Sequence, residues 1–247
     1  MISQEFPNLG WQFLSGDVAP TRVQVFGERS SGTNFVKRLI GRNTGLVPIE
    51  DLGWKHGFPQ MTAIPQDVLV VTVVRDARDW TLSMFAKPWH ATPEMQRMEF
   101  SAFIRTGWAT IADRPRYFPQ SAAHGSIGQP LQFDRHPITG AVFDNLFALR
   151  RAKLHGHLSL LSRTRPAALV RLEAAQADPQ GFLSALCGAL GLPPAETYRP
   201  VVKRLGAKFR PSVDRRPTVP ARLSVADLAF LRTETDVRQE AQLGYVY

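Results

Sequence analysis

The stretch "TRVQVFGERSSGTNFVKRLIGR", residues 21–42, joins three local patterns that together indicate the fold. Residues 21–26 form a β-branched run that is typical of a strand, and Gly27 ends that run. Apolar side chains then recur at helical spacing over residues 33–42. The stretch therefore predicts a strand, a glycine-rich turn and a helix in direct succession.

The same order of elements recurs along the chain. The nearly continuous apolar run at 67–74 is typical of a strand buried on both faces of a parallel sheet, and a helical pattern follows it. A third strand is predicted at 167–173, and a long helix is predicted at 145–163. Within residues 178–194 a further helix is predicted to begin near Asp178 and Pro179 and to end at Gly191. This alternation favours a three-layer α/β domain with a central parallel sheet flanked by helices.

The chain has 247 residues with 44% hydrophobic composition, which favours one domain over residues 1–247. Residues 87–140 interrupt the regular order with many prolines and interspersed aromatics, and they hold one helical candidate near 95–106. Long irregular segments of this kind are frequently lids or substrate loops, so this segment is predicted to cover a substrate. An idle surface insertion is the alternative. The tail is helical again near 224–235.

The formal charge of +9 and the pI near 10.3 favour an anionic partner. Nucleotides, phosphates, acidic glycans, nucleic acid and lipid head groups all fit that charge. The absence of zinc-finger spacing, of an RNP-like aromatic strand and of a lysine-rich tail argues against a specific nucleic-acid function. No heptad pattern indicates an oligomer.

The single cysteine, Cys187, excludes an intramolecular disulfide and is predicted to be a buried helix residue. The N-terminal residues lack the basic start and apolar run of a signal peptide, and no apolar stretch reaches about 18 residues. A cytoplasmic protein without a transmembrane segment is therefore expected.

Gly27 and Gly32 are separated by four residues, as in the phosphate-binding pattern G-x-x-x-x-G-K-[ST], but Thr33 and Asn34 replace the lysine and the metal-binding hydroxyl. The backbone N–H groups of such a turn and the helix N-terminus still favour a phosphate-like anion. This glycine spacing predicts a P-loop-NTPase-like fold. The loop is predicted to bind its anion without a metal ion. The candidate ligands in the loop are Arg29, Ser30, Ser31, Gly32, Thr33 and Asn34.

A second anion site is predicted where the strand at 67–74 ends. Arg75 lies at its carboxyl end, where ligands of parallel sheets gather, and Ser83 follows eight residues later. If a helix begins near Asp76, both side chains face the same side. An arginine fork and a hydroxyl suit a second phosphate.

The stretch "RSSGTNF", residues 29–35, and the pair Arg75 and Ser83 resemble sulfotransferases that use 3′-phosphoadenosine 5′-phosphosulfate (PAPS). In that family an S-G-T loop cradles the 5′-phosphosulfate, and an arginine with a serine eight residues later grips the 3′-phosphate. The resemblance implies that PAPS is the donor, that no metal takes part, and that the chain is a bacterial-type member of the family.

The stretch "GWKHGFP", residues 53–59, resembles the family's catalytic K-T-H motif in a K-H version. The resemblance implies that His56 is the catalytic base, a role that suits a neutral imidazole. It also implies that Lys55 neutralises the bridging oxygen of the leaving nucleotide, although a solvent-facing lysine fits the sequence as well.

Three positions depart from the family pattern or match it only loosely. Leu172 stands where the family usually has a tyrosine, and Arg29 with Ser30 replaces the lysine that precedes S-G-T. The family's basic C-terminal loop over the 3′-phosphate corresponds in place to residues 203–212, with no match residue by residue.

These motifs predict a metal-independent sulfotransferase that moves a sulfuryl group from PAPS to a hydroxyl or amine of a small-molecule or glycan acceptor. One alternative is a non-catalytic nucleotide- or anion-binding protein of the same fold. The other is a P-loop phosphotransferase, which would need the missing lysine and a Mg²⁺ ligand near the loop.

Overall fold

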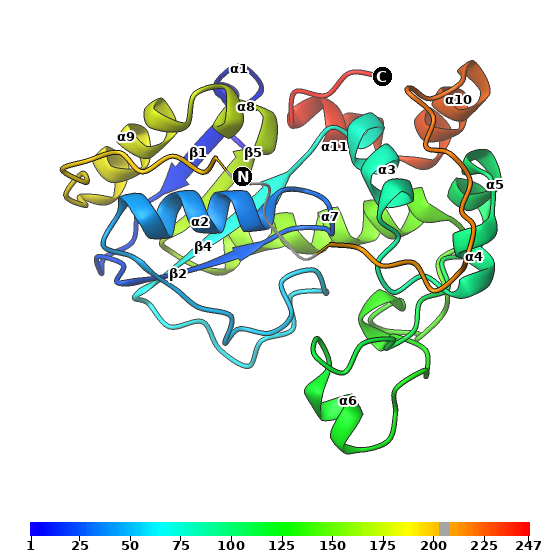
Figure 1. Ribbon diagram of the computed structural model, residues 1–247. Coiled ribbons are helices and arrows are strands. Elements are labelled where there is room, and N and C mark those ends of the chain that lie inside the picture. Colours follow the sequence, from blue (N-terminus) through cyan, green and yellow to red (C-terminus); the bar gives the residue numbers. More distant parts are fainter. Residues whose placement is uncertain (203–207) are drawn as a thin grey trace. The chain divides into compact units, whose positions relative to one another are not determined.

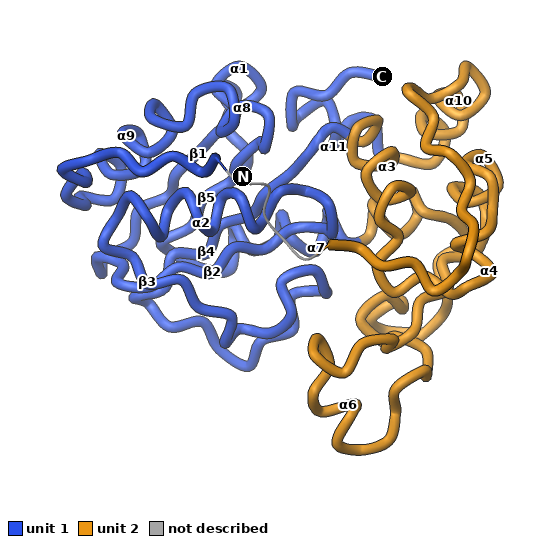
Figure 2. The backbone as a smooth tube through the Cα atoms, in the orientation of Figure 1, with its two compact units in different colours: residues 1–76, 153–207, 236–247 blue, residues 77–152, 208–235 orange. Residues whose placement is uncertain are grey.

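The computed structural model describes residues 1–202 and 208–247 (Figure 1). The chain divides into two compact units (Figure 2). Unit 1 comprises residues 1–76, 153–207 and 236–247, and unit 2 comprises residues 77–152 and 208–235. Lys203 and Arg204 of the basic stretch at 203–212 lie outside the described residues.

The strands of the described residues form one five-stranded sheet in unit 1, in the order β1-β5-β4-β2-β3. Strands β2, β3, β4 and β5 are parallel to one another, whereas β1 pairs with β5 in the antiparallel sense. The bounds are β1 Trp11–Leu14, β2 Arg22–Phe26, β3 Val47–Pro48, β4 Val68–Val74 and β5 Ala167–Arg171.

The expected α/β class with a helix-flanked sheet is confirmed, but the sheet is mixed and not wholly parallel. Only residues 15–21 join β1 to β2. Parallel strands of one sheet need a crossover connection of about a dozen residues or more, so this short link cannot return the chain to run parallel. An antiparallel edge strand on an otherwise parallel sheet is a common result.

Helices cover both faces of the sheet in unit 1 (Figure 1). Helices α2, α8 and α9 pack on one face with Val25 and Val71, while α7 packs on the other with Phe26 and Val70. Helix α7 begins in unit 2 and ends in unit 1. The bounds are α1 Phe6–Leu9, α2 Thr33–Asn43, α7 Leu146–Arg163, α8 Leu172–Ala177, α9 Pro179–Leu190 and α11 Val237–Gln242.

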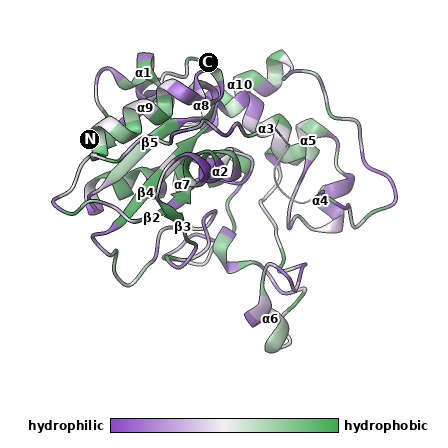
Figure 3. Cartoon of the chain, turned by 60° about the vertical axis from the view of Figure 1, so that its left-hand side comes forward, coloured by the Kyte–Doolittle hydropathy of each residue, from purple (hydrophilic) through white to green (hydrophobic). Residues whose placement is uncertain are grey.

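The central strand β4 is apolar except for Thr72, and all seven of its residues are buried. Figure 3 shows the strands of the sheet as a hydrophobic band. A strand covered on both faces loses the alternation of polar and apolar residues, which is why the run at 67–74 was recognisable as a buried parallel strand. The predicted strands at 21–26 and 167–173 are confirmed with bounds shifted by up to two residues.

Helix α9 shows how local sequence sets the ends of an element. The Asp178 side chain caps its first turn by accepting from the Gly181 N–H at 2.8 Å, and Pro179 occupies the first helical position. Gly191 ends the helix in the left-handed conformation, as predicted. Cys187 is buried within α9, and that burial raises the pKa of its thiol.

Unit 2 consists of short helices joined by irregular segments, and the whole of residues 87–140 lies within it. The helix expected at 95–106 is interrupted, because Met98 and Glu99 adopt extended backbone conformations between α4 and α5. That residues 1–247 form a single domain stays a prediction. The bounds are α3 Ala77–Ala86, α4 Pro93–Arg97, α5 Phe100–Arg105, α6 Pro119–Ala123, η1 Gln132–Asp134 and α10 Val225–Glu234.

The packing of the sheet can be tested with Val71→Ala, which removes two fully buried methyl groups from β4. The variant is expected to lower the free energy of unfolding by about 2 kcal/mol, measured by urea denaturation. Val47→Ala is the matched control, because Val47 is 59% exposed on β3 and should change stability little. Equal losses in the two variants would contradict the assigned core.

Candidate functional site

The turn between β2 and α2 adopts a backbone conformation that few sequences tolerate. Ser30 and Gly32 are left-handed, with φ of 65° and 91°. For a serine this is an uncommon, strained conformation. The Arg75 Nη1 atom donates to the Ser30 carbonyl at 2.9 Å, and Ser31 donates through both N and Oγ to the Glu28 carbonyl. The turn is thus held by its own hydrogen bonds and by Arg75.

Gly32 is required both for its backbone conformation and for space. A Cβ atom at this position would lie 2.3 Å from Cδ1 of Leu172. Leu172 is the first residue of α8 and is 5% exposed. It is the residue that occupies the place of the tyrosine in the sequence motif, and its side chain packs against Gly32 of the turn.

No side chain of the described residues neutralises the N-terminus of α2. Gly32 occupies the cap position, and in the described residues no side chain caps the helix and no acidic residue lies in its first turn. The first N–H groups of a helix and its dipole favour negative charge at such an end. Residues 27–33 therefore form a turn that suits a phosphate-like group.

The candidate ligands in the turn differ in how far they are available. Ser30, Gly32 and Asn34 are partly exposed. Ser31 and Thr33 are 1% and 3% exposed, so their hydroxyls are turned into the protein. Of the three hydroxyl-bearing residues predicted as ligands in the turn, only Ser30 is therefore partly exposed.

The loop at 49–57 is bonded to the turn at a single residue. The Gly27 N–H donates to the Lys55 carbonyl at 3.0 Å, and His56 Nδ1 lies 2.7 Å from the Gly27 carbonyl. Buried Gln24 holds the same loop by donating to the Gly53 carbonyl at 3.0 Å and accepting from the Leu52 N–H at 2.8 Å. The predicted base and the predicted anion turn are thus brought together.

The bond to Gly27 decides the tautomer of His56. A carbonyl oxygen only accepts, so Nδ1 carries the proton and a neutral ring leaves the lone pair on Nε2. Within residues 1–202 and 208–247, Nε2 has no hydrogen-bond partner. His56 can therefore accept a proton at Nε2 while its ring is held by the other nitrogen.

Burial, followed by the charge of Lys55, lowers the pKa of His56 well below its usual range. The bond to Gly27 opposes this shift, while Arg29 and Lys153 add to it. The ring of Trp54 contacts His56 edge-on, and it lies beneath the Arg29 guanidinium at 5.7 Å and the Lys153 amine at 5.5 Å. His56 is consequently neutral near pH 7, the state that a base requires.

Lys55 reaches toward the start of α2 and not into solvent. Its Nζ donates to Asn34 Oδ1 at 2.9 Å and to Glu50 Oε1 at 3.0 Å, and Glu50 also bonds Lys37. Burial lowers the pKa of Lys55, and Glu50 opposes that change. The amine stands beside the second residue of α2, so it supplies positive charge near the turn that lacks the usual lysine.

The predicted second anion pair is divided between the two units. Arg75 follows β4 in unit 1 and bonds the turn at Ser30. The next residue, Asp76, donates through its N–H to Glu173 Oε1 at 2.9 Å, and Tyr245 donates to Oε2 of the same carboxylate. Ser83 lies in α3 of unit 2.

Several residues that contact His56 or the loop carrying it were not identified from the sequence. Lys153 donates to the His56 carbonyl at 2.8 Å, and His157 Nε2 donates to the Gly57 carbonyl at 2.9 Å. Both lie on α7, four residues apart and so on one face of the helix. A lysine and a histidine at that spacing in a leucine-rich helix are a signal that could have identified them. Gln24 and Trp54 carry no comparable signal.

The described part of the chain contains no group of three or more His, Cys, Asp or Glu side chains placed to hold a metal ion. Over the same residues, no helix is long and apolar enough to cross a membrane.

A scan against protein-family models, a search of curated proteins and a search of solved structures found no match for this chain. The case for a function therefore rests on the residues and geometry of the site.

The buried histidine of α7 predicts a pH dependence of stability. Burial, then Lys153, lowers the pKa of His157 from 6.5 to about 4. Because the unfolded chain binds this proton more readily, stability is present above pH 6.5 and is lost as the pH falls toward 4. The loss from this group is about 3 kcal/mol over that window, measured by urea denaturation at each pH.

In His157→Gln, whose amide can still donate to Gly57, this part of the loss should disappear. His155→Gln is the control, because His155 is exposed on the same helix. If both variants kept the wild-type slope, His157 would not be buried in its neutral form.

Proposed function

We propose that this protein is a PAPS-dependent sulfotransferase with a P-loop-like fold. The observation that carries the proposal is the shared hydrogen bonding at Gly27, which joins a base with a free Nε2 to an anion-binding turn. A nucleotide phosphosulfate held at the turn would place its reacting end close to that base. Chemistry then needs an acceptor whose proton His56 can take.

The transfer step balances with these groups alone. An acceptor hydroxyl or amine attacks the sulfur of PAPS, and its proton passes to Nε2 of His56. The bond between sulfur and the bridging oxygen breaks, and 3′-phosphoadenosine 5′-phosphate (PAP) leaves with that electron pair. The sulfuryl group is thereby moved to the acceptor by in-line transfer.

Charge near the turn supports the departure of the nucleotide. The N–H groups at the start of α2 and the Lys55 amine both favour negative charge on the bridging oxygen. The buried Arg29 adds a further cation beside Trp54. These groups make a metal unnecessary for neutralising the phosphosulfate, so the proposed reaction is metal-independent.

The geometry favours sulfuryl transfer over phosphoryl transfer. A P-loop phosphotransferase uses a hydroxyl at the start of the helix to hold Mg²⁺. Here Asn34 occupies that position, and its oxygen accepts from Lys55. The acceptor class in the proposal is a hydroxyl or amine of a small molecule or glycan, and a single cysteine is in keeping with a cytoplasmic setting.

The donor is tested by isothermal titration calorimetry with PAP, AMP and ATP in the absence of metal. Wild-type protein is expected to bind PAP at least about tenfold more tightly than AMP, because only PAP carries the 3′-phosphate. Arg75→Ala is expected to weaken PAP binding by about tenfold to a hundredfold and to weaken AMP binding much less, because AMP lacks the 3′-phosphate.

The ratio of the two affinities separates a lost ligand contact from a damaged turn, since Arg75 also bonds Ser30. Loss of both nucleotides would mean that Arg75 only supports the turn. A wild-type preference for ATP with Mg²⁺ would overturn the proposed donor.

The base is tested with His56→Gln, which retains a side-chain donor for Gly27 but has no basic nitrogen. Release of PAP from PAPS, measured with a panel of phenol, alcohol and amine acceptors, is expected to fall by about a hundredfold or more. PAP binding should be retained, and His155→Gln should be fully active. Unchanged turnover in His56→Gln would remove the base from the mechanism, and binding without turnover in the wild type would favour the non-catalytic alternative.

A further inference from the structure

The positive charge of the chain is concentrated in unit 2. Residues 77–152 and 208–235 contain fifteen Lys and Arg against nine Asp and Glu. Two short segments of this unit, 113–117 and 208–216, hold six of those cations and two of the acids. Charge of one sign gathered in short segments marks a place where an anionic partner would bind.

Arg114 joins the two segments. Its guanidinium lies over the rings of Trp89 at 4.7 Å and Phe209 at 5.4 Å, and its Nη2 donates to the Arg210 carbonyl at 2.8 Å. Its Nε donates to Asp113, which also bonds His90. Arg114 is therefore a structural cation that contacts the ring of Phe209 and holds the backbone of Arg210.

Arg216 fixes the other end of the second segment. It lies over the rings of Phe85 and Phe209 at 5.6 and 5.4 Å, and it donates to the carbonyls of Phe85 and Ala86. Between the two arginines, Ser212 exchanges two hydrogen bonds with buried Gln96. Segment 208–216 is therefore held at Arg210, at Ser212 and at Arg216. The exposed side chains of this segment are attached to a backbone that these contacts order.

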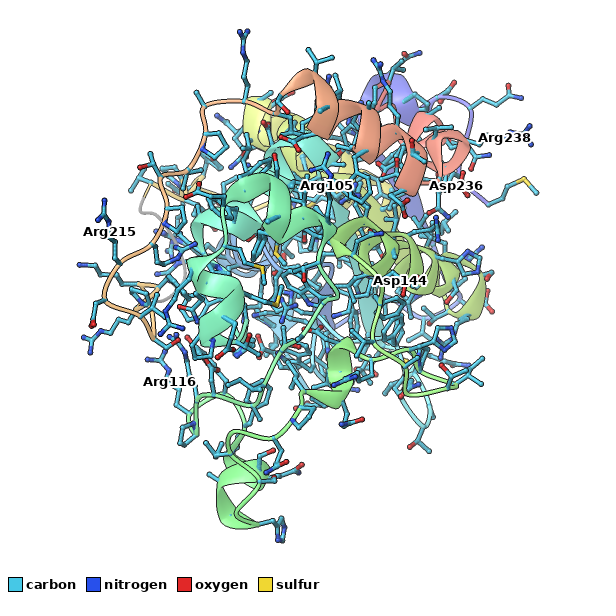
Figure 4. The ribbon with its side chains drawn as sticks, turned by 90° about the vertical axis from the view of Figure 1, so that its right-hand side faces the viewer. Arg105, Arg116, Asp144, Arg215, Asp236 and Arg238 are labelled. Atoms are coloured by element: carbon cyan, nitrogen blue, oxygen red, sulfur yellow. The ribbon has the colours of Figure 1, made fainter. Side chains whose placement is uncertain are left out.

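Four cations remain on the outside of this braced structure, and we call them the basic ledge: Arg116, Lys208, Arg210 and Arg215. All four are exposed, and among the described residues none of their side chains forms an ion pair. Arg116 and Arg215 are labelled in Figure 4, where both extend outward from unit 2. Asp214 is the exposed acid within the same segment.

The arrangement of the rings narrows the class of partner. Proteins that bind single-stranded nucleic acid stack bases on open aromatic faces. Here Trp89 and Phe209 contact each other edge-on and are covered by the two structural arginines. The ledge also lies on irregular backbone and not on the amphipathic helix that a membrane surface favours. The basic ledge therefore offers a partner positive charge and hydrogen-bond donors.

We propose that the basic ledge binds an acidic polysaccharide whose sulfate or carboxylate groups recur along the chain. Arginine forks match the geometry of both groups, and several exposed cations on one ordered backbone can bind several anions of one polysaccharide. Because the backbone beneath is already ordered, little conformational freedom is lost on binding. This inference stands on unit 2 alone and does not depend on the proposed function.

The test uses the full chain without nucleotide and a heparin oligosaccharide of defined length as the probe, with hyaluronate as a carboxylate-only probe. Replacing all four ledge cations with glutamine is expected to weaken heparin binding by about tenfold or more. Binding should also weaken steadily as salt is added. The control variant carries Arg38→Gln, Arg222→Gln, Arg232→Gln and Arg238→Gln, which removes the same charge from exposed positions elsewhere and should bind nearly as wild type.

Three outcomes would overturn the assignment. Equal losses in the ledge and control variants would show binding by overall charge. Tighter binding of a thymidine oligonucleotide of matched charge, or of phosphatidylserine vesicles, would point to nucleic acid or a membrane. Displacement of heparin by saturating PAP would assign the ledge to the nucleotide. Heparin binding without any PAP binding would support the ledge and count against the proposed function, so the two proposals fail separately.

Discussion

The peptide groups of Gly27 connect the predicted base to the anion-binding turn. The N–H bonds the Lys55 carbonyl and the carbonyl accepts from His56, so the loop at 49–57 is fastened to the end of β2. Only glycine fits there, because a Cβ atom would lie 2.5 Å from the Val73 carbonyl oxygen and 2.7 Å from Ser31 Oγ. The buried parallel pair β2 and β4 thus sets where the turn and the imidazole stand.

The parts that could be predicted from the sequence depend on neighbours along the chain. The strand, turn and helix at 21–42 follow from period and from two glycines, and α9 follows from Asp178 and Gly191. The packing of helices on both faces of the sheet follows from the repeated succession of strand and helix along the chain. The adjacency of His56 to the turn was expected from a motif, and its hydrogen bond supplies the physical reason.

The parts that could not be predicted depend on residues far apart in the chain. Lys153 reaches the His56 carbonyl across 97 residues, and nothing near either residue in the sequence indicates that contact. The antiparallel sense of β1 follows from a short connection whose effect appears only when the sheet is assembled. The break between α4 and α5, where Met98 and Glu99 are extended, similarly has no counterpart in the periodicity of the sequence.

The crowding of cations around His56 bears on how its basicity would respond to an anion. Burial first, and then the charges of Lys55, Arg29 and Lys153, disfavour the protonated ring and hold the pKa of His56 well below its usual range. An anion at the turn would offset part of that field and raise the pKa of the ring. The protonation of the imidazole would then depend on whether an anion is bound at the turn.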